Sequence, residues 1–205
     1  TWFTSHLEPH WREQYQALTD PAERAAWDAK LGRIDAAAIA ATLGAWVRTS
    51  DDGGRTWNPP VRMGLTAPHG PIRRTDGSLL YLGKEFGADM QAFSHGAGRI
   101  LALQSVDRGA TWQPLGAVPL YPGTECGHYH EAHVAEVPGR KLIGLIRFEN
   151  CSGSDVTARG LVSFSLMQTE SKDGGQTWSQ ARPLGFHGSP PHLLYHSSGV
   201  LIGVY

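Results

Sequence analysis

One short motif occurs three times in this chain of 205 residues and constrains its fold more than any other feature. The stretches "SDDGGRTW", "SVDRGATW" and "SKDGGQTW" occupy residues 50–57, 105–112 and 171–178, and all three fit S-x-D-x-G-x-T-W. Internal similarity of this kind is typical of repeat architectures, in which each copy is one supersecondary unit stacked on the next. We therefore expect repeated units.

The residue types in this motif suit a tight turn. The aspartate can accept backbone N–H hydrogen bonds, the glycine can adopt a positive φ, and the tryptophan offers a large apolar face to a neighbouring unit. We interpret the motif as a structural turn that folds and anchors a hairpin, not as a catalytic site. The residues concerned are Asp52, Gly54 and Trp57, Asp107, Gly109 and Trp112, and Asp173, Gly175 and Trp178.

A second repeat follows each of these turns. The stretches "GPIRRTDGSLLYLGKE", "AHVAEVPGRKLIGLIRFE" and "PPHLLYHSSGVLIGVY" each read as strand, turn and strand, with the turns at Asp76-Gly77, Pro138-Gly139 and Ser198-Gly199. Each unit therefore carries about four strands, and repeated four-stranded antiparallel units are the blades of a β-propeller. The sequence predicts an all-β fold, a β-propeller of four-stranded antiparallel blades, with about three blades in this chain.

We expect a short α-helical insertion near the N-terminus, at about residues 11–44. In "LTDPAERAAWDAKLG", Asp20 is a suitable N-cap, Pro21 fits the first helical position and Gly32 fits the helix end. The stretch "DAAAIAATLG" repeats this arrangement with Asp35 and Gly44. A lid over a site and a packing element are both open as roles for these two short helices.

Charge and apolar content exclude two classes of partner. The formal net charge of −1 argues against a nucleic-acid partner, because such proteins carry a basic excess or stripe. No apolar run approaches the roughly 18 residues that cross a bilayer, so we expect no membrane span. Cys126 and Cys151 flank one hairpin, where a disulfide in an oxidising compartment and two separate thiols are both open. We expect no cofactor.

The three motifs resemble the Asp-boxes, or BNR repeats, of the sialidase (neuraminidase) superfamily. The resemblance covers nearly all of Ala45–Tyr205 and implies a six-bladed β-propeller. About three blades are half of six, so residues 1–205 look like a partial propeller, an internal fragment of a longer protein. Asp-boxes also occur in propellers that are not enzymes, so these turns alone do not imply catalysis.

A second stretch resembles sialidases more specifically. "EAHVAEVPGRKLIGLIR" is similar to their segment E-x-x-V-x-E-L-P-D-G-x-L-…-R and aligns Glu131 and Arg147 with its first Glu and last Arg. The resemblance implies that Glu131 partners a nucleophilic Tyr and that Arg147 binds the substrate carboxylate. This chemistry is consistent, because a guanidinium binds a carboxylate in bidentate fashion and sialidases use a Tyr nucleophile. Plain surface roles for both residues stay open.

The register of the repeats predicts further residues at the same place. His69 and Glu131 each lie eight residues before the glycine of their turn, and Lys84 aligns with Arg147. Because equivalent positions of blades meet around the propeller axis, we expect these four side chains near one mouth of the propeller. His69 and Lys84 are accordingly predicted to bind substrate.

The stretch "CGHYHEAH" concentrates Cys126, His128, His130 and His133. Their spacing matches no zinc motif, and alternation along a strand would place His128 and His130 on one face, with Glu131 and His133 on the other. We therefore expect no metal site. His130 and His133 are predicted to hydrogen-bond sugar hydroxyls or to orient Glu131, and plain structural roles are equally open. By the same blade logic, nearby histidines in "GFHGSPPH", His187 and His192, could line this mouth.

The resemblance implies an exo-sialidase-like glycoside hydrolase that releases terminal sialic acid, or a related acidic sugar, from glycoconjugates. Two alternatives stay open: a propeller glycosidase or lyase acting on another acidic polysaccharide with histidines as acid and base, and a non-catalytic glycan-binding propeller. The remaining family residues, an Asp acid/base, two further Arg and the Tyr, have no convincing match here. We therefore expect residues 1–205 alone to be inactive, and the full-length protein to be secreted or periplasmic.

Overall fold

The protein is described by a computed structural model that covers two compact units, Thr1–Gly44 and Ala45–Tyr205. No helix in the described part of the chain is long and apolar enough to cross a membrane. Cys151, one of the two cysteines, lies outside the described residues, as does most of the second expected helix. The structure describes residues 13, 15–32, 37, 44–85, 98–150 and 155–205.

In the first unit, helix α2 (Pro21–Leu31) forms where the sequence predicts it. The Asp20 side chain caps its N-terminus by accepting a hydrogen bond from the Ala22 N–H at 2.8 Å, and Pro21 occupies the first turn, where its missing N–H costs nothing. Gly32 ends the helix, and its N–H donates to the Asp28 carbonyl at 2.8 Å.

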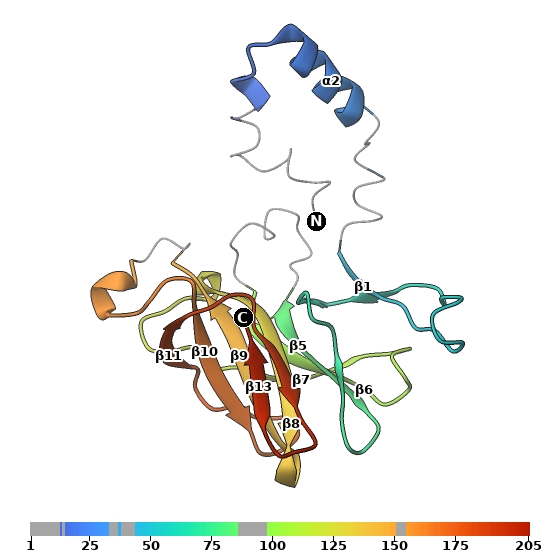
Figure 1. Cartoon of the computed structure of the whole chain (residues 1–205), viewed down its shortest axis with the longest axis vertical. Coiled ribbons are helices and arrows are strands. Elements are labelled where there is room, and N and C mark those ends of the chain that lie inside the picture. Colours follow the sequence, from blue (N-terminus) through green and yellow to red (C-terminus); the bar gives the residue numbers. More distant parts are fainter. Residues whose placement is uncertain (1–12, 14, 33–36, 38–43, 86–97, 151–154) are drawn as a thin grey trace. The chain divides into compact units, whose positions relative to one another are not determined.

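The second unit contains two complete blades (Figure 1). The first is a sheet in the order β3-β5-β6-β7, with β4 also paired to β5. All of its pairs are antiparallel. Its Asp-box lies between the last two strands. The strands are β3 (Leu65–Thr66), β4 (Ile72–Arg73), β5 (Leu79–Glu85), β6 (Ile100–Ser105) and β7 (Gln113–Ala117).

The other complete blade is the four-stranded antiparallel sheet β8-β9-β10-β11. A hairpin joins its first two strands, and the third Asp-box joins its last two. The strands are β8 (Tyr129–Val137), β9 (Lys141–Phe148), β10 (Ser165–Ser171) and β11 (Arg182–His187).

A two-stranded sheet flanks each end of this pair of blades. β1 (Ala45–Val47) pairs with β2 (Val61–Met63) around the first Asp-box, and β12 (His192–Tyr195) pairs with β13 (Leu201–Val204) around the last hairpin. The antiparallel four-stranded blade architecture is therefore confirmed, but the grouping of hairpins with Asp-boxes into blades differs from the expected one. Each complete sheet joins a hairpin to the Asp-box that follows it, and not to the one before it.

The hairpin turns form as the sequence predicts. Gly77, Gly139 and Gly199 have φ of 86°, 78° and 89°, values that cost little only for a residue without a Cβ atom. The turns connect β4 to β5, β8 to β9 and β12 to β13.

Each Asp-box is closed by the same hydrogen bonds, seen clearly in the third copy. The Gly175 N–H donates to Ser171 Oγ at 2.8 Å, and that hydroxyl donates to Asp173 Oδ1 at 2.8 Å. The Thr177 N–H and hydroxyl donate to the two carboxylate oxygens of Asp173 at 2.9 and 2.5 Å. The corresponding bonds recur in the other two copies.

The tryptophans of the three boxes differ in burial. Trp178 is 6% exposed and donates from its indole nitrogen to the Gly175 carbonyl at 3.1 Å. Trp112 is half-buried and makes the equivalent bond to Gly109. Trp57, in the first sheet of the described segment, is 58% exposed, so its packing against a neighbouring unit stays a prediction.

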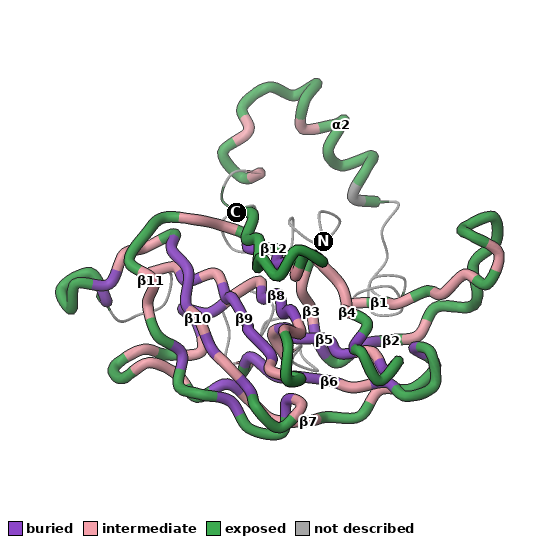
Figure 2. The backbone as a smooth tube through the Cα atoms, turned by 60° about the horizontal axis from the view of Figure 1, so that its bottom comes forward, coloured by how far each residue is buried: buried purple, intermediate pink, exposed green. Residues whose placement is uncertain are grey.

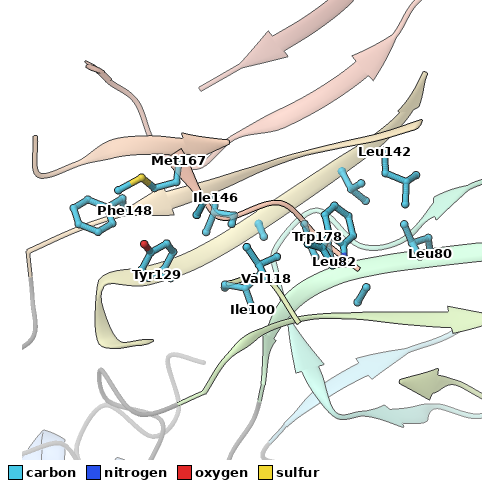
Figure 3. Packing of buried hydrophobic residues seen from close by; sticks show 14 of the residues in the cluster. Leu80, Leu82, Ile100, Val118, Tyr129, Leu142, Ile146, Phe148, Met167 and Trp178 are labelled. Atoms are coloured by element: carbon cyan, nitrogen blue, oxygen red, sulfur yellow. The ribbon is translucent and has the colours of Figure 1, made fainter. Parts of the chain in front are cut away.

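The largest apolar core lies between the two complete blades (Figure 3). Leu80, Leu82 and Ile100 come from the first blade, and Tyr129 and Ile146 from the second. Smaller clusters fill the interfaces with the flanking two-stranded sheets, and buried residues follow β8, β9 and β10 (Figure 2). Packing of one blade against the next therefore supplies the core, as stacked repeats require.

Candidate functional site at the start of β8

A β-bulge near the start of β8 brings Glu131 and Arg147 together. Tyr129 pairs with Phe148 and Ala132 pairs with Ile146, so two residues of β8 face the single residue Arg147 of β9. An extra residue of this kind re-aims side chains locally, and bulges are common beside functional sites. Arg147 Nη1 donates to both carboxylate oxygens of Glu131, at 3.0 and 2.9 Å.

Two further contacts hold the Arg147 guanidinium, while its third nitrogen has no partner. Its Nη2 donates to Glu149, its plane lies over the Phe164 ring with the guanidinium carbon 5.2 Å from the centroid, and its Nε is buried without a hydrogen-bond partner. Phe164 is half-exposed and has a positive φ of 51°, which is unusual for a bulky residue. Two carboxylates and an aromatic ring thus fix the orientation of this cation.

Lys84 lies at the same end of β8 and is bonded to the backbone. Its Nζ donates to the carbonyls of Cys126 and Tyr129 at 3.1 and 2.8 Å. The side chain therefore ties β5 of the first blade to the beginning of β8 in the second, close to the bulge.

Three imidazoles gather beside this pair. His69 lies between β3 and β4, His133 on β8 and His192 at the start of β12, so each comes from a different sheet. The His133 and His192 rings are stacked, with centroids 4.2 Å apart and an interplanar angle of 19°. The His69 ring meets both edge-on, with centroid distances of 5.4 Å.

His133 is the most buried of the three and is neutral at ordinary pH. It is 3% exposed, and its Nδ1 accepts a hydrogen bond from the Leu193 N–H at 2.8 Å. Burial, with His192 and His69 beside it, lowers the pKa of His133 from 6.5 to about 4. The hydrogen bond also fixes the tautomer, because an Nδ1 that accepts leaves the proton on Nε2.

His69 is less buried, but one of its ring nitrogens has no partner. Burial and the nearby His192 lower the pKa of His69 below 6.5, and the carboxylate of Glu131 partly opposes this shift. The Nε2 atom is buried and makes no hydrogen bond. A buried polar atom without a partner needs an explanation, such as a bound ligand or water.

Three other histidines of the predicted mouth, all among the described residues, lie outside this cluster. His128 is fully buried in a 3-10 turn before β8, where its Nδ1 accepts from the Glu125 N–H at 2.9 Å, so its expected place on a strand face is wrong. His130 is half-buried in the bulge. His187 is exposed on β11, the strand farthest from β8 in its sheet, and therefore lies away from the cluster.

The geometry offers no metal centre in the described part of the chain, where no three His, Cys, Asp or Glu residues are placed to hold an ion. It does bring His69, Lys84, Glu131 and Arg147 to the start of β8. Reasoning from the sequence missed Glu149 and Phe164. Only the alternation along β9 and its extension could have indicated Glu149, and nothing indicated Phe164.

Comparisons with known proteins agree with this architecture. The family model of the BNR/Asp-box repeat matches residues 48–59. Among solved structures, a Dyadobacter fermentans protein of unknown function gives a TM-score of 0.63 at 20% identity, covering 78% of this chain and 44% of that one. An α-L-arabinanase from Penicillium chrysogenum, complexed with arabinobiose, gives 0.51 at 17% identity, covering 73% and 46%.

The Hadza microbial sialidase Hz136 is also similar, with a TM-score of 0.44 and 24% identity over 66% of this chain and 24% of that one. This chain has a β-propeller-like fold that carries BNR/Asp-box turns. It spans less than half of each of these three structures, and a comparison with curated proteins found no match. The Glu131–Arg147 pair lies on two strands of one blade, and the imidazoles come from that blade and from the sheets on either side of it, so a rigid β scaffold positions all of these groups.

Proposed function

We propose that the full-length protein is an exo-sialidase-like glycoside hydrolase that releases a terminal sialic acid, or a related acidic sugar, from glycoconjugates. The observation that carries this proposal is the Glu131–Arg147 pair across the β8 bulge. The glycoside-hydrolase-like fold supports it, because this fold presents residues of several blades to one ligand. The proposed partner is a glycan, and the proposed location is outside the cytoplasm, secreted or periplasmic.

In this proposal Arg147 binds the sugar carboxylate. Its guanidinium is rigidly oriented by Glu149 and the Phe164 ring, so little side-chain entropy is lost when an anion binds. The substrate carboxylate would take the place of Glu131 at Nη1, and Glu131 would then be released as a base beside the reacting sugar.

Hydrolysis of a fluorogenic sialoside by the full-length protein tests this proposal. Arg147→Ala should raise KM by about a hundredfold, because a charge-assisted contact is lost, and Glu131→Gln should lower kcat by a similar factor, because the base is lost. The matched control is Arg182→Ala, since Arg182 is exposed on the outer strand β11. Unchanged turnover in either site variant would contradict the assigned roles.

A second candidate function is a glycosidase or lyase that acts on another acidic polysaccharide. The imidazole cluster favours it, because a histidine can serve as acid or base near neutral pH. A lyase would break the glycosidic bond by elimination and leave an unsaturated product that absorbs ultraviolet light. Incubation of the full-length protein with polyuronates, monitored by absorbance, separates this outcome from hydrolysis.

A further inference from the structure

A backbone hydrogen bond from the next sheet determines which ring nitrogen of His133 carries the proton and can donate. Since its Nδ1 accepts from Leu193 N–H, the neutral ring must carry its proton on Nε2. An Nε2–H group can donate to an oxygen atom but has no lone pair to offer. His133 is therefore an obligate donor, and its burial keeps the ring neutral.

This tautomer also argues against metal binding by the cluster. A histidine that ligates a metal normally donates its other N–H to a carbonyl or carboxylate. In His133 the other nitrogen accepts instead, so ligation through Nε2 would require loss of both the proton and the Leu193 hydrogen bond. The arrangement is that of a polar binding surface and not of a cation site.

His69 supplies the complementary feature. Its Nε2 is buried and unpartnered while its ring touches both His133 and His192. A hydroxyl group can donate and accept at the same time. It can therefore satisfy this nitrogen in either tautomer while it accepts a hydrogen bond from His133.

His192 connects the buried part of the cluster with solvent. It is exposed, and its ring is stacked on His133. The acidic and basic groups near the cluster are Glu131, which bears on His69 through its charge, and Arg147, which is bonded to Glu131. The three imidazoles thus lie beside an ion pair.

From these contacts we propose that His69, His133 and His192 form a binding subsite for a hydroxyl group of a sugar, next to the Glu131–Arg147 pair. This inference rests on the proposed function in one respect, because it takes the ligand to be a sugar. It requires binding and not turnover, so the two can fail separately.

The test is a titration of the full-length protein followed by NMR of the imidazole carbon and nitrogen signals at neutral pH. The probes are N-acetylneuraminic acid, glucuronic acid and neutral methyl α-mannoside, with acetate as a carboxylate that lacks hydroxyls. We expect at least one sugar to shift the signals of His69 and His133 saturably, and acetate to leave them unchanged. The His133 nitrogen signals should report protonation at Nε2.

Variants identify the donors. His192→Ala, at an exposed position, and His133→Leu should each weaken binding of the sugar by about tenfold, the value of one neutral hydrogen bond. His133→Gln should restore most of the affinity, because its amide can accept from Leu193 and donate into the site. His187→Ala, on the outer strand β11, is the matched control and should bind as the parent does.

Three outcomes would overturn the inference. Equal shifts with acetate would make the cluster a carboxylate site, and stoichiometric zinc binding that is lost in His69→Ala would make it a metal site. Absence of imidazole shifts with every sugar would leave the cluster a packing element. If the imidazole signals respond while no glycoside is hydrolysed, the subsite stands and the proposed hydrolase activity fails.

Discussion

At the scale of single residues, the Asp-box carboxylates link folding to pH. Hydrogen bonds from the side-chain hydroxyl and N–H of the following threonine, and from the preceding serine, lower the pKa of Asp107 and of Asp173 from 3.8 to about 2. A carboxyl whose pKa is lowered on folding stabilises the folded state above its unfolded pKa. That stabilisation disappears as the pH falls through the folded pKa.

We expect the free energy of unfolding to decrease between about pH 4 and about pH 2, as these carboxylates become protonated. Asp107→Asn cannot accept the Thr111 hydroxyl bond with its amide nitrogen, so it should be less stable than the parent at neutral pH. The two proteins should converge below about pH 2, where the parent carboxyl is neutral too. Urea unfolding followed by tryptophan fluorescence at a series of pH values measures this, and a constant difference would contradict it.

The box tryptophans provide a matched pair of substitutions. Trp178→Ala removes a side chain that is 6% exposed and should lower the free energy of unfolding by about 3–5 kcal/mol. Trp57→Ala changes the same position of the first box, but this ring is 58% exposed, so the loss should be about 0.5 kcal/mol. Chemical denaturation of both variants compares them, and similar losses would refute the argument from burial.

At the scale of elements, the outer strand of one blade lies directly against the Asp-box of the next. The Gly116 N–H of β7 donates to the Gly175 carbonyl at 2.8 Å. A Cβ atom on Gly116 would lie 2.1 Å from the Gln176 carbonyl oxygen, so this glycine is needed for the close approach of two backbones.

Gly116→Ala should therefore separate β7 from the third box and cost about 1–3 kcal/mol of unfolding free energy. Gly64→Ala is the control, because an added Cβ there meets no atom within 4 Å and its φ is not positive. Denaturant unfolding of the two variants checks the prediction. Equal stability would show that the blades do not depend on this contact.

The elements differ in how far the sequence predicts them. The hairpins and boxes are predictable because their signals are local: a glycine with positive φ at Gly77 and an Asx-type turn at Asp173 need only their own neighbours. The meeting of His69, His133 and His192 depends on how three sheets are rotated relative to each other. Alternation along one strand does not contain that information, so the cluster could be anticipated only in part.

At the scale of the second unit, packing between sheets determines which apolar side chains are buried in the core and which stay exposed to solvent. Leu193 is 5% exposed and packs on the second complete blade. Its neighbour Leu194 and the cross-strand partner Ile202 are 53% and 40% exposed. An exposed apolar sheet face of this kind favours association.

In the protein of residues 1–205, we expect the double variant Leu194→Lys, Ile202→Glu to bind less of a fluorescent apolar dye and to self-associate less than the parent. Opposite charges on a cross-strand pair are tolerated, so the free energy of unfolding should change by no more than about 1 kcal/mol. Leu193→Lys should instead unfold the end of the sheet. Dye fluorescence and light scattering are the measurements, and unchanged dye binding would contradict the prediction.

Which hairpin shares a sheet with each Asp-box is also decided at the scale of the second unit. From the sequence, each box could be joined with the hairpin before it or with the one after it, because both are separated from it by short stretches. Sheet pairing decides in favour of the hairpin before it, as β8–β9 with β10–β11 illustrates. The local patterns are the same in both arrangements, so only packing between distant strands distinguishes them.

Because of the bulge near the start of β8, the face on which each side chain lies depends on the number of residues between Tyr129 and Ala132. Tyr129 and Ala132 are three positions apart, an odd number, yet both belong to the same buried cluster. A regular strand would send them to opposite faces. Deleting one residue between them, whatever its identity, would exchange inside for outside along one end of the strand. Substitution scans alone would therefore overlook this dependence, whereas insertions and deletions at this point would expose it at once.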